Sequence, residues 1–181
     1  MIDQMQSKMK KGILLIFTVA LLSGLTVRKA TAQASINAKV NAEVILALTA
    51  TETAELNFGR FSPETTGGEV KVSPAGVRSA KGKVALSGGT HNSASFYITG
   101  QYEATVTITL PSAPAILRNS VTAKTMEVSD WESDPPAGLA SGKLDKGELA
   151  VNVGASLKVG TMTENPVGIY AGTYSITFSY N

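Results

Sequence analysis

The chain has 181 residues, a formal net charge of +2 and no cysteine. A single domain of this length can bury enough apolar surface to be stable without disulfides. The lack of cysteine excludes a lipid-anchored bacterial lipoprotein, zinc sites rich in cysteine, and Cys-His nucleophiles.

Residues 1–32 have the pattern of a signal peptide. Lysines precede an apolar run from Gly12 to Leu25, and the ATA at residues 30–32 supplies small residues at a cleavage spacing. A retained signal anchor is the alternative, because two basic residues separate the run from that site, although the run is short for a bilayer span. We expect cleavage after Ala32, export to the periplasm, cell surface or medium, and no membrane span after cleavage.

Removal of this leader changes the charge balance. The leader holds five basic residues and one acidic residue, so residues 33–181 keep 11 basic and 13 acidic side chains, a net charge of −2. Binding to nucleic acid or to an anionic membrane needs a clustered positive field. We therefore expect no nucleic-acid partner.

Apolar residues after residue 33 alternate with period two, which is typical of antiparallel strands. The first predicted strand covers residues 34–48, and AELNFGRF (54–61) and EVKVS (69–73) follow, with SPETTGG between them as a hairpin loop. KVALS (83–87), SFYITG (95–100) and YEATVTITLP (102–111) are the next strands. Short turns rich in glycine, proline, asparagine and serine separate them.

The second half continues this pattern. A short strand at TMEV (125–128) precedes an irregular acidic loop, SDWESDPPAG (129–138), and two short strands then flank Gly154. The ending, GTYSITFSYN, alternates aromatic or aliphatic residues with hydroxyl residues. About ten short strands and no helical period after the leader predict one domain over residues 33–181, an all-β, immunoglobulin-like antiparallel β-sandwich.

Little in the sequence indicates catalysis. His91 is the only histidine and lies in a turn without an evident catalytic partner. No glycine-rich loop opens a helix, because no helix is predicted. We therefore expect no enzymatic activity and no cofactor.

The acidic loop allows three interpretations. Asp130, Glu132 and Asp134 could supply oxygen ligands to calcium, but the loop lacks the glycine and closing glutamate of a known calcium loop. Trp131 could be a buried anchor that pins the loop, or a sugar-stacking platform together with Tyr102. We expect no metal site, and keep a self-contained carbohydrate-binding module as the alternative function.

Two motifs carry a resemblance to a known family. LNFG at residues 56–59 and G-x-Y-x-G-x-Y at residues 168–174, with the order of the strands from about Leu46 onward, resemble the bacterial secreted family called domain of unknown function 4402. This resemblance implies an exported β-sandwich related to pilins and to spore coat protein U, with no established enzymatic activity.

The ending also resembles that of chaperone-usher pilus subunits, which have a penultimate aromatic residue and a glycine fourteen places from the end. In pili this strand is held by a periplasmic chaperone, and it lines a groove that the N-terminal extension of the next subunit fills by β-strand addition. The resemblance implies that a chaperone or partner strand contacts these residues: Gly168, Tyr174, Ile176, Phe178 and Tyr180.

Residues 34–44 are a candidate donor strand, because every even-numbered residue there is apolar. The residues expected to fill a partner's groove are Ile36, Ala38, Val40, Ala42 and Val44. The alternative is that they form the first strand of a complete domain. We expect an exported structural or adhesive subunit, pilin-like or coat-like, whose partners are other subunits or a periplasmic chaperone, with glycans as ligands under the alternative function.

Overall fold

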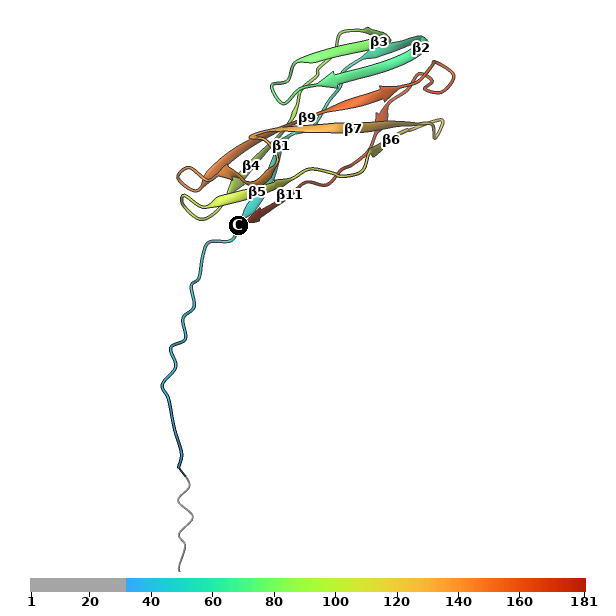
Figure 1. Ribbon diagram of the computed structural model, residues 1–181. Helices are drawn as coiled ribbons and strands as arrows, with labels where there is room; N and C mark the ends of the chain where they lie inside the picture. Colours follow the sequence, from blue (N-terminus) through green and yellow to red (C-terminus); the bar gives the residue numbers. More distant parts are fainter. Residues whose placement is uncertain (1–31) are drawn as a thin grey trace, which may run out of the picture. The chain divides into compact units, whose positions relative to one another are not determined.

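A computed structural model describes residues 32–181 (Figure 1). The chain divides into two units, residues 1–42 and 43–181. The expected signal peptide lies outside the described residues except for Ala32. No helix in residues 32–181 has the length and apolar character needed to cross a membrane.

Residues 32–42 have no secondary structure, and every one of them is exposed. The exposed fractions of Ile36 and Val40 are 92 % and 93 %. The prediction of a strand over residues 34–48 is wrong, because the first strand, β1, begins only at Thr49. Alternation makes a segment suitable for a strand, but a strand forms only where backbone groups find a partner, and residues 34–48 have no ladder partner in the described part of the chain.

All strands of the described residues lie in the second unit and pair antiparallel. The expected immunoglobulin-like antiparallel β-sandwich is confirmed, with eleven strands where about ten are predicted (Figure 1). Their bounds are β1 Thr49–Ala54, β2 Phe61–Val72, β3 Arg78–Leu86, β4 Ala94–Thr99, β5 Thr105–Thr109, β6 Ala115–Asn119, β7 Thr125–Asp134, β8 Gly138–Lys143, β9 Glu148–Val159, β10 Tyr170–Ala171 and β11 Thr177–Tyr180.

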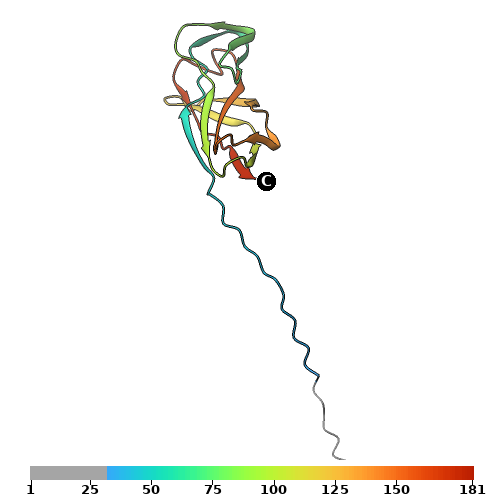
Figure 2. The same ribbon diagram turned by 90° about the vertical axis from the view of Figure 1, so that its left-hand side faces the viewer.

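Two sheets form the sandwich. The larger has the path β1-β4-β9-β7-β6-β10, and the hairpin of β2 and β3 joins it through the pairing of β2 with β9. The smaller has the order β11-β5-β8. Figure 2 shows β1 and the C-terminal strand β11 at the same end of this unit, and a hydrogen bond from the Tyr180 hydroxyl to the Leu46 carbonyl confirms that the two regions meet.

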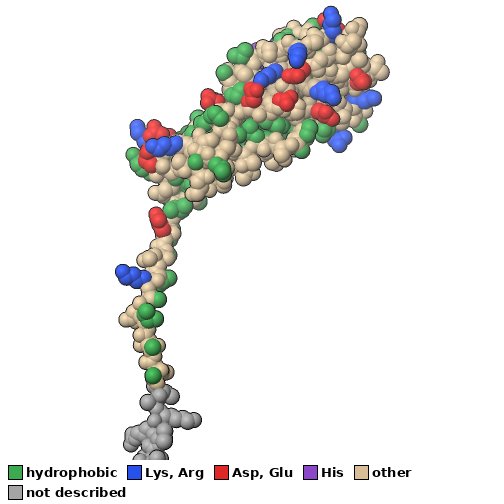
Figure 3. Space-filling model, viewed as in Figure 1, with side chains coloured by type: hydrophobic (Ala, Val, Ile, Leu, Met, Phe, Trp, Pro, Cys, Tyr) green, Lys and Arg blue, Asp and Glu red, His purple; other side chains and the backbone are tan. Residues whose placement is uncertain are grey.

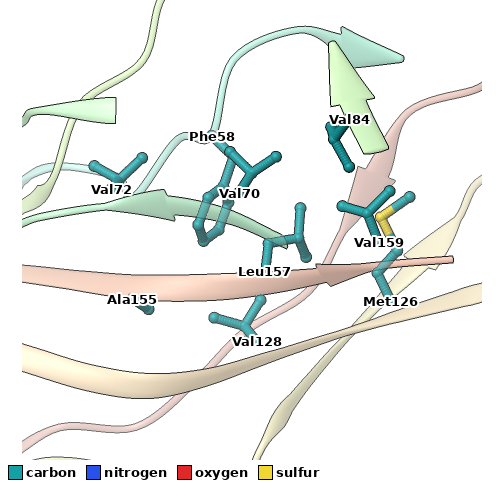
Figure 4. Close-up of a cluster of buried hydrophobic side chains, with 9 residues drawn as sticks. All are labelled: Phe58, Val70, Val72, Val84, Met126, Val128, Ala155, Leu157 and Val159. Carbon is teal, nitrogen blue, oxygen red and sulfur yellow. The ribbon is translucent and has the colours of Figure 1, made fainter. Parts of the chain in front are cut away.

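The core consists of two clusters of buried side chains. The β2 cluster, shown in Figure 4, contains Phe58, Val70, Val72, Val84, Met126, Val128, Ala155, Leu157 and Val159. The β5 cluster contains Ala94, Ile98, Val106, Ile108, Leu144, Val151 and Val153. Strand β9 contributes side chains to both clusters. Its odd-numbered residues all point inward, and the strand is long enough to extend from one cluster to the other.

Two predicted interruptions are parts of continuous strands. Strand β9 runs through Gly154, where a Cβ atom would lie 2.3 Å from the Val72 carbonyl oxygen. This glycine therefore permits close approach of β2 and does not end a strand. The SPETTGG segment, predicted as a hairpin loop, lies inside β2, and an irregularity between Pro63 and Gly67 accommodates it.

Most of the predicted acidic loop is strand β7, and a β-bulge explains why the alternation hides it. Ser129 pairs with Ser156 and Glu132 with Gly154, so β7 holds one extra residue between the two pairs. The extra residue reverses which parity faces inward. Val128 is buried before the bulge and Trp131 packs against the core after it.

A core substitution tests this packing. We expect Leu157→Ala to lower the free energy of unfolding by about 2–5 kcal/mol, because Leu157 is 2 % exposed within the β2 cluster. Leu139→Ala in β8 is the matched control, since Leu139 is 86 % exposed and should change stability by less than about 0.5 kcal/mol. Urea unfolding measures both, and equal losses would contradict the assigned core.

Candidate functional site

An apolar groove of about 820 Å³ opens onto the β2 cluster. One side is formed by residues 55–63, which lead from β1 into β2, and the other by residues 166–174, which contain β10. The floor consists of core side chains of β6, β7 and β9: Ala115, Leu117, Met126, Val128, Trp131 and Leu157. The groove therefore borders the sandwich core along a line between two backbone segments. Three floor residues, Ala115, Leu117 and Trp131, are half-buried, and the other three are at most 5 % exposed.

Side chains of neighbouring segments hold the first wall, residues 55–60, by hydrogen bonds to its backbone. The Arg78 guanidinium donates hydrogen bonds to the carbonyls of Phe58 at 3.1 Å and Arg60 at 3.3 Å. Asn92 donates its side-chain amide to the Glu55 carbonyl at 2.5 Å and forms the one bridge of this segment, with Asn57. These contacts fix the backbone of the first wall.

The second wall depends on the buried amide of Asn119, which is 3 % exposed. Asn119 donates to the Pro166 carbonyl at 3.4 Å and accepts hydrogen bonds from the backbone of Val121 and Thr122. A Cβ atom at Gly168 would lie 2.4 Å from the Asn119 side chain. The glycine that the sequence singles out thus allows this wall to approach β6 closely.

Both walls have the alternation of a strand but not its pairing. Burial alternates through residues 54–58 and 173–180. Yet residues 55–60 form no strand and share backbone hydrogen bonds only at Asn57, with Asn92, and at Arg60, with Ser87 and Gly88, and residues 172–176 form no strand. Both segments are predicted as strands from sequence, and this part of the prediction is wrong at the level of backbone pairing. Within residues 32–181, β1 likewise pairs only with β4, and β11 only with β5.

A stacked aromatic pair stands at the junction of the two clusters and lines the groove. The rings of Trp131 and Tyr174 lie 4.6 Å apart at 30°, and Trp131 packs against both clusters. Nε1 of Trp131 and the Tyr174 hydroxyl are shielded from solvent without a hydrogen-bond partner among the described residues. Burial, and secondarily the charge of Glu52, raises the pKa of Tyr174 above its ordinary value of 10.0.

The remaining residues of the C-terminal row pack against the β5 cluster. Ile176, Phe178 and Tyr180 are half-buried there, and Phe178 lies 5.9 Å from the ring of Phe96. The prediction that this row faces the core is confirmed. The structure thus brings Tyr174, Ile176, Phe178 and Tyr180 to one cluster, while Gly168 lies in the groove wall.

The Tyr180 hydroxyl connects the C-terminus to the start of the folded unit. It accepts a hydrogen bond from the Gln101 N–H at 2.6 Å and donates one to the Leu46 carbonyl at 3.0 Å. The Leu46 N–H donates in turn to the Gln101 side chain at 3.3 Å. The penultimate aromatic residue therefore fixes the point at which the chain enters the sandwich.

The proposed donor residues lie before that point. Ile36, Ala38, Val40 and Ala42 are exposed in the first unit, and Val44 is 97 % exposed in the second. Val44 precedes β1 by four residues of chain without secondary structure. The structure does not assign them to any sheet of the described residues.

The other candidate residues do not converge. Tyr102 is 63 % exposed in the turn after β4, whereas Trp131 is packed into the core, and His91 is exposed. Glu132 forms an ion pair with Lys71 at 2.6 Å on the outer face of the main sheet. In residues 32–181, no three histidine, cysteine or acidic residues lie close enough together to hold a metal ion.

Charges of both signs are interspersed on the face shown in Figure 3. Lys158 and Glu127 lie 4.0 Å apart across β9 and β7, beside the pair of Lys71 and Glu132. Such exposed pairs contribute little to stability, and they create no field of a single sign. The groove is thus the most distinct surface feature of the described unit.

Sequence reasoning missed the groove because pairing is a tertiary property. LNFG and the ending are amphipathic in sequence, but the sequence does not indicate that each contains residues outside any strand. The anchoring roles of Arg78, Asn92 and Asn119 have no local sequence signal either, since the wall carbonyls to which they donate lie between 18 and 47 residues away.

Comparison with known proteins gives a family and no function. The family model described as domain of unknown function (DUF4402) matches residues 48–180. No curated protein matches the chain, and no solved structure does.

The buried Tyr174 hydroxyl gives a pH-dependent prediction. Because burial raises the folded pKa of Tyr174, the hydroxyl ionises first in the unfolded chain. Its ionisation leaves the unfolding free energy unchanged below about pH 10, the ordinary tyrosine value, and lowers it as the pH rises above that value. We expect the unfolding free energy of the native chain to fall relative to Tyr174→Phe between about pH 9 and pH 11.

At neutral pH, Tyr174→Phe should keep or raise stability by about 1 kcal/mol, because it removes a buried hydroxyl without a partner. Tyr102→Phe, at an exposed tyrosine, is the control. Chemical denaturation at each pH measures the differences. Parallel pH curves for the native chain and Tyr174→Phe would contradict the assigned burial.

Proposed function

For a chain that belongs to the domain of unknown function family DUF4402, we propose the function of an exported structural or adhesive subunit that assembles by β-strand addition. The groove between residues 55–63 and 166–174 is the acceptor. The donor is residues 34–44 of a second copy. The role is structural, not catalytic.

One observation carries the proposal: two segments that alternate in burial but belong to no strand border the same apolar groove. Residues 55–58 and 173–176 alternate in burial, and core side chains form the floor of the groove. An inserted strand could pair its backbone with such a segment while its inward side chains cover the floor. It would complete a sandwich in which the C-terminal row, from Tyr174 to Tyr180, is only half-buried.

The donor segment has the matching chemistry. Ile36 and Val40 lie on one parity with Ala38 and Ala42, and all four are exposed. Burying an isoleucine or valine side chain contributes about 1.5–3 kcal/mol, so several large residues and a ladder of backbone hydrogen bonds supply a stable contact. An exposed row of this kind otherwise invites uncontrolled association.

The same groove suits a periplasmic chaperone before assembly. A chaperone strand would cover the apolar floor during export and leave when the donor of the next subunit arrives. Both partners use the backbone of the walls, so one acceptor serves the two stages.

Assembly is tested with charge placed on either face of the donor. We expect the purified exported chain to form oligomers, and Ile36→Asp with Val40→Asp to give monomers, because each aspartate would have to enter the apolar groove. Asn37→Asp with Asn41→Asp is the matched control: it adds acidic residues to the opposite parity and should still assemble. Light scattering after size-exclusion chromatography gives the masses.

Two outcomes would contradict the proposal. The first is an unchanged mass in the variant with aspartates at positions 36 and 40. The second is equal loss of assembly in both variants, because that result would reflect net charge and not the face of a strand.

A further inference from the structure

The donor segment has a second periodicity within its apolar face. Large residues at positions 36, 40 and 44 alternate with alanines at 38 and 42. Successive residues on one face of a strand are separated by about 6.6–6.8 Å, so large and small side chains would meet the groove in turn. A uniformly apolar strand could slip by two residues, whereas this one has unequal positions.

The groove is also unequal along its length. At the junction of the two clusters the rings of Trp131 and Tyr174 stack 4.6 Å apart, and Trp131 is the largest side chain that lines the groove. Single aromatic rings, those of Phe58, Phe61 and Tyr170, line the groove as well. Elsewhere the floor consists of smaller side chains, such as Ala115, Leu117 and Val128. An inserted side chain has less room above the stacked pair than above the smaller floor residues.

We propose that the Trp131–Tyr174 stack sets the register of the inserted strand by accepting one of its alanines, Ala38 or Ala42. The large residues on either side of that alanine then cover the smaller floor residues. This inference rests on the proposed function, because it specifies how the same groove reads its donor. It makes Trp131 and Tyr174 specificity-determining residues.

The acceptor for the test is the full chain with Ile36→Asp and Val40→Asp, which cannot supply its own donor. The probe is a fluorescent peptide with the sequence of residues 33–46. Its control exchanges Ile36 with Ala38 and Val40 with Ala42, so composition, charge and parity are unchanged. Fluorescence anisotropy should show at least about tenfold weaker binding of the exchanged peptide, since overpacking costs about 1–3 kcal/mol.

A second pair of peptides tests whether the Trp131–Tyr174 stack is the part of the groove that sets the register. One peptide carries Ala38→Leu and the other carries Ala42→Leu. One of the two should bind this acceptor about tenfold more weakly than the native peptide does. Adding Tyr174→Leu to the acceptor should restore the binding of that weakened peptide. Binding of the native peptide to the Tyr174→Leu acceptor verifies that this acceptor is folded and competent.

The outcomes separate the two proposals. If the native peptide binds no acceptor, the proposed function fails. If the native and exchanged peptides bind equally, strand insertion stands and the register proposal is overturned. If neither leucine peptide is weakened, or if Tyr174→Leu restores nothing, the stack does not set the register.

Discussion

The structure depends on two physical requirements. Extended backbone needs hydrogen-bond partners, and apolar side chains need to be covered by other apolar groups. Through most of residues 43–181 these requirements are met by antiparallel pairing and by the two clusters. They are not met between residues 55–60 and 172–176, where two amphipathic segments border an apolar groove. The proposed function follows from these missing strand partners beside an apolar groove.

The groove is a fixed part of the fold, because specific hydrogen bonds hold both of its walls in place. Hydrogen bonds from Arg78 and Asn92 hold one wall, and Asn119 holds the other, where Gly168 allows close approach. The β7 bulge turns Trp131 into the groove floor, where it stacks on Tyr174. A groove with fixed walls loses less conformational entropy when a strand enters than one that must first order itself.

The sequence predicts the fold class well because period-two alternation is a local property. It correctly indicates an all-β sandwich and an inward C-terminal row. It fails where local amphipathicity and tertiary pairing disagree: residues 34–48 and 55–60 alternate but form no strands. It fails also at the acidic segment around Trp131, where a bulge reverses the parity and hides a strand. Gly154 and Gly168 stand out in the sequence, but only the structure explains them as points of close approach.

The most direct test is amide hydrogen exchange in the assembled chain and in the monomer with Ile36→Asp and Val40→Asp. The account predicts that the amides of residues 172–176, of Leu56 and Phe58, or of both groups exchange quickly in the monomer and become protected on assembly. The amides of Asn57, Gly59 and Arg60 already donate hydrogen bonds within the subunit. Amides of β9, already paired on both sides, should be protected in both states. Unchanged exchange of both walls in an assembled sample would contradict insertion of a strand between them.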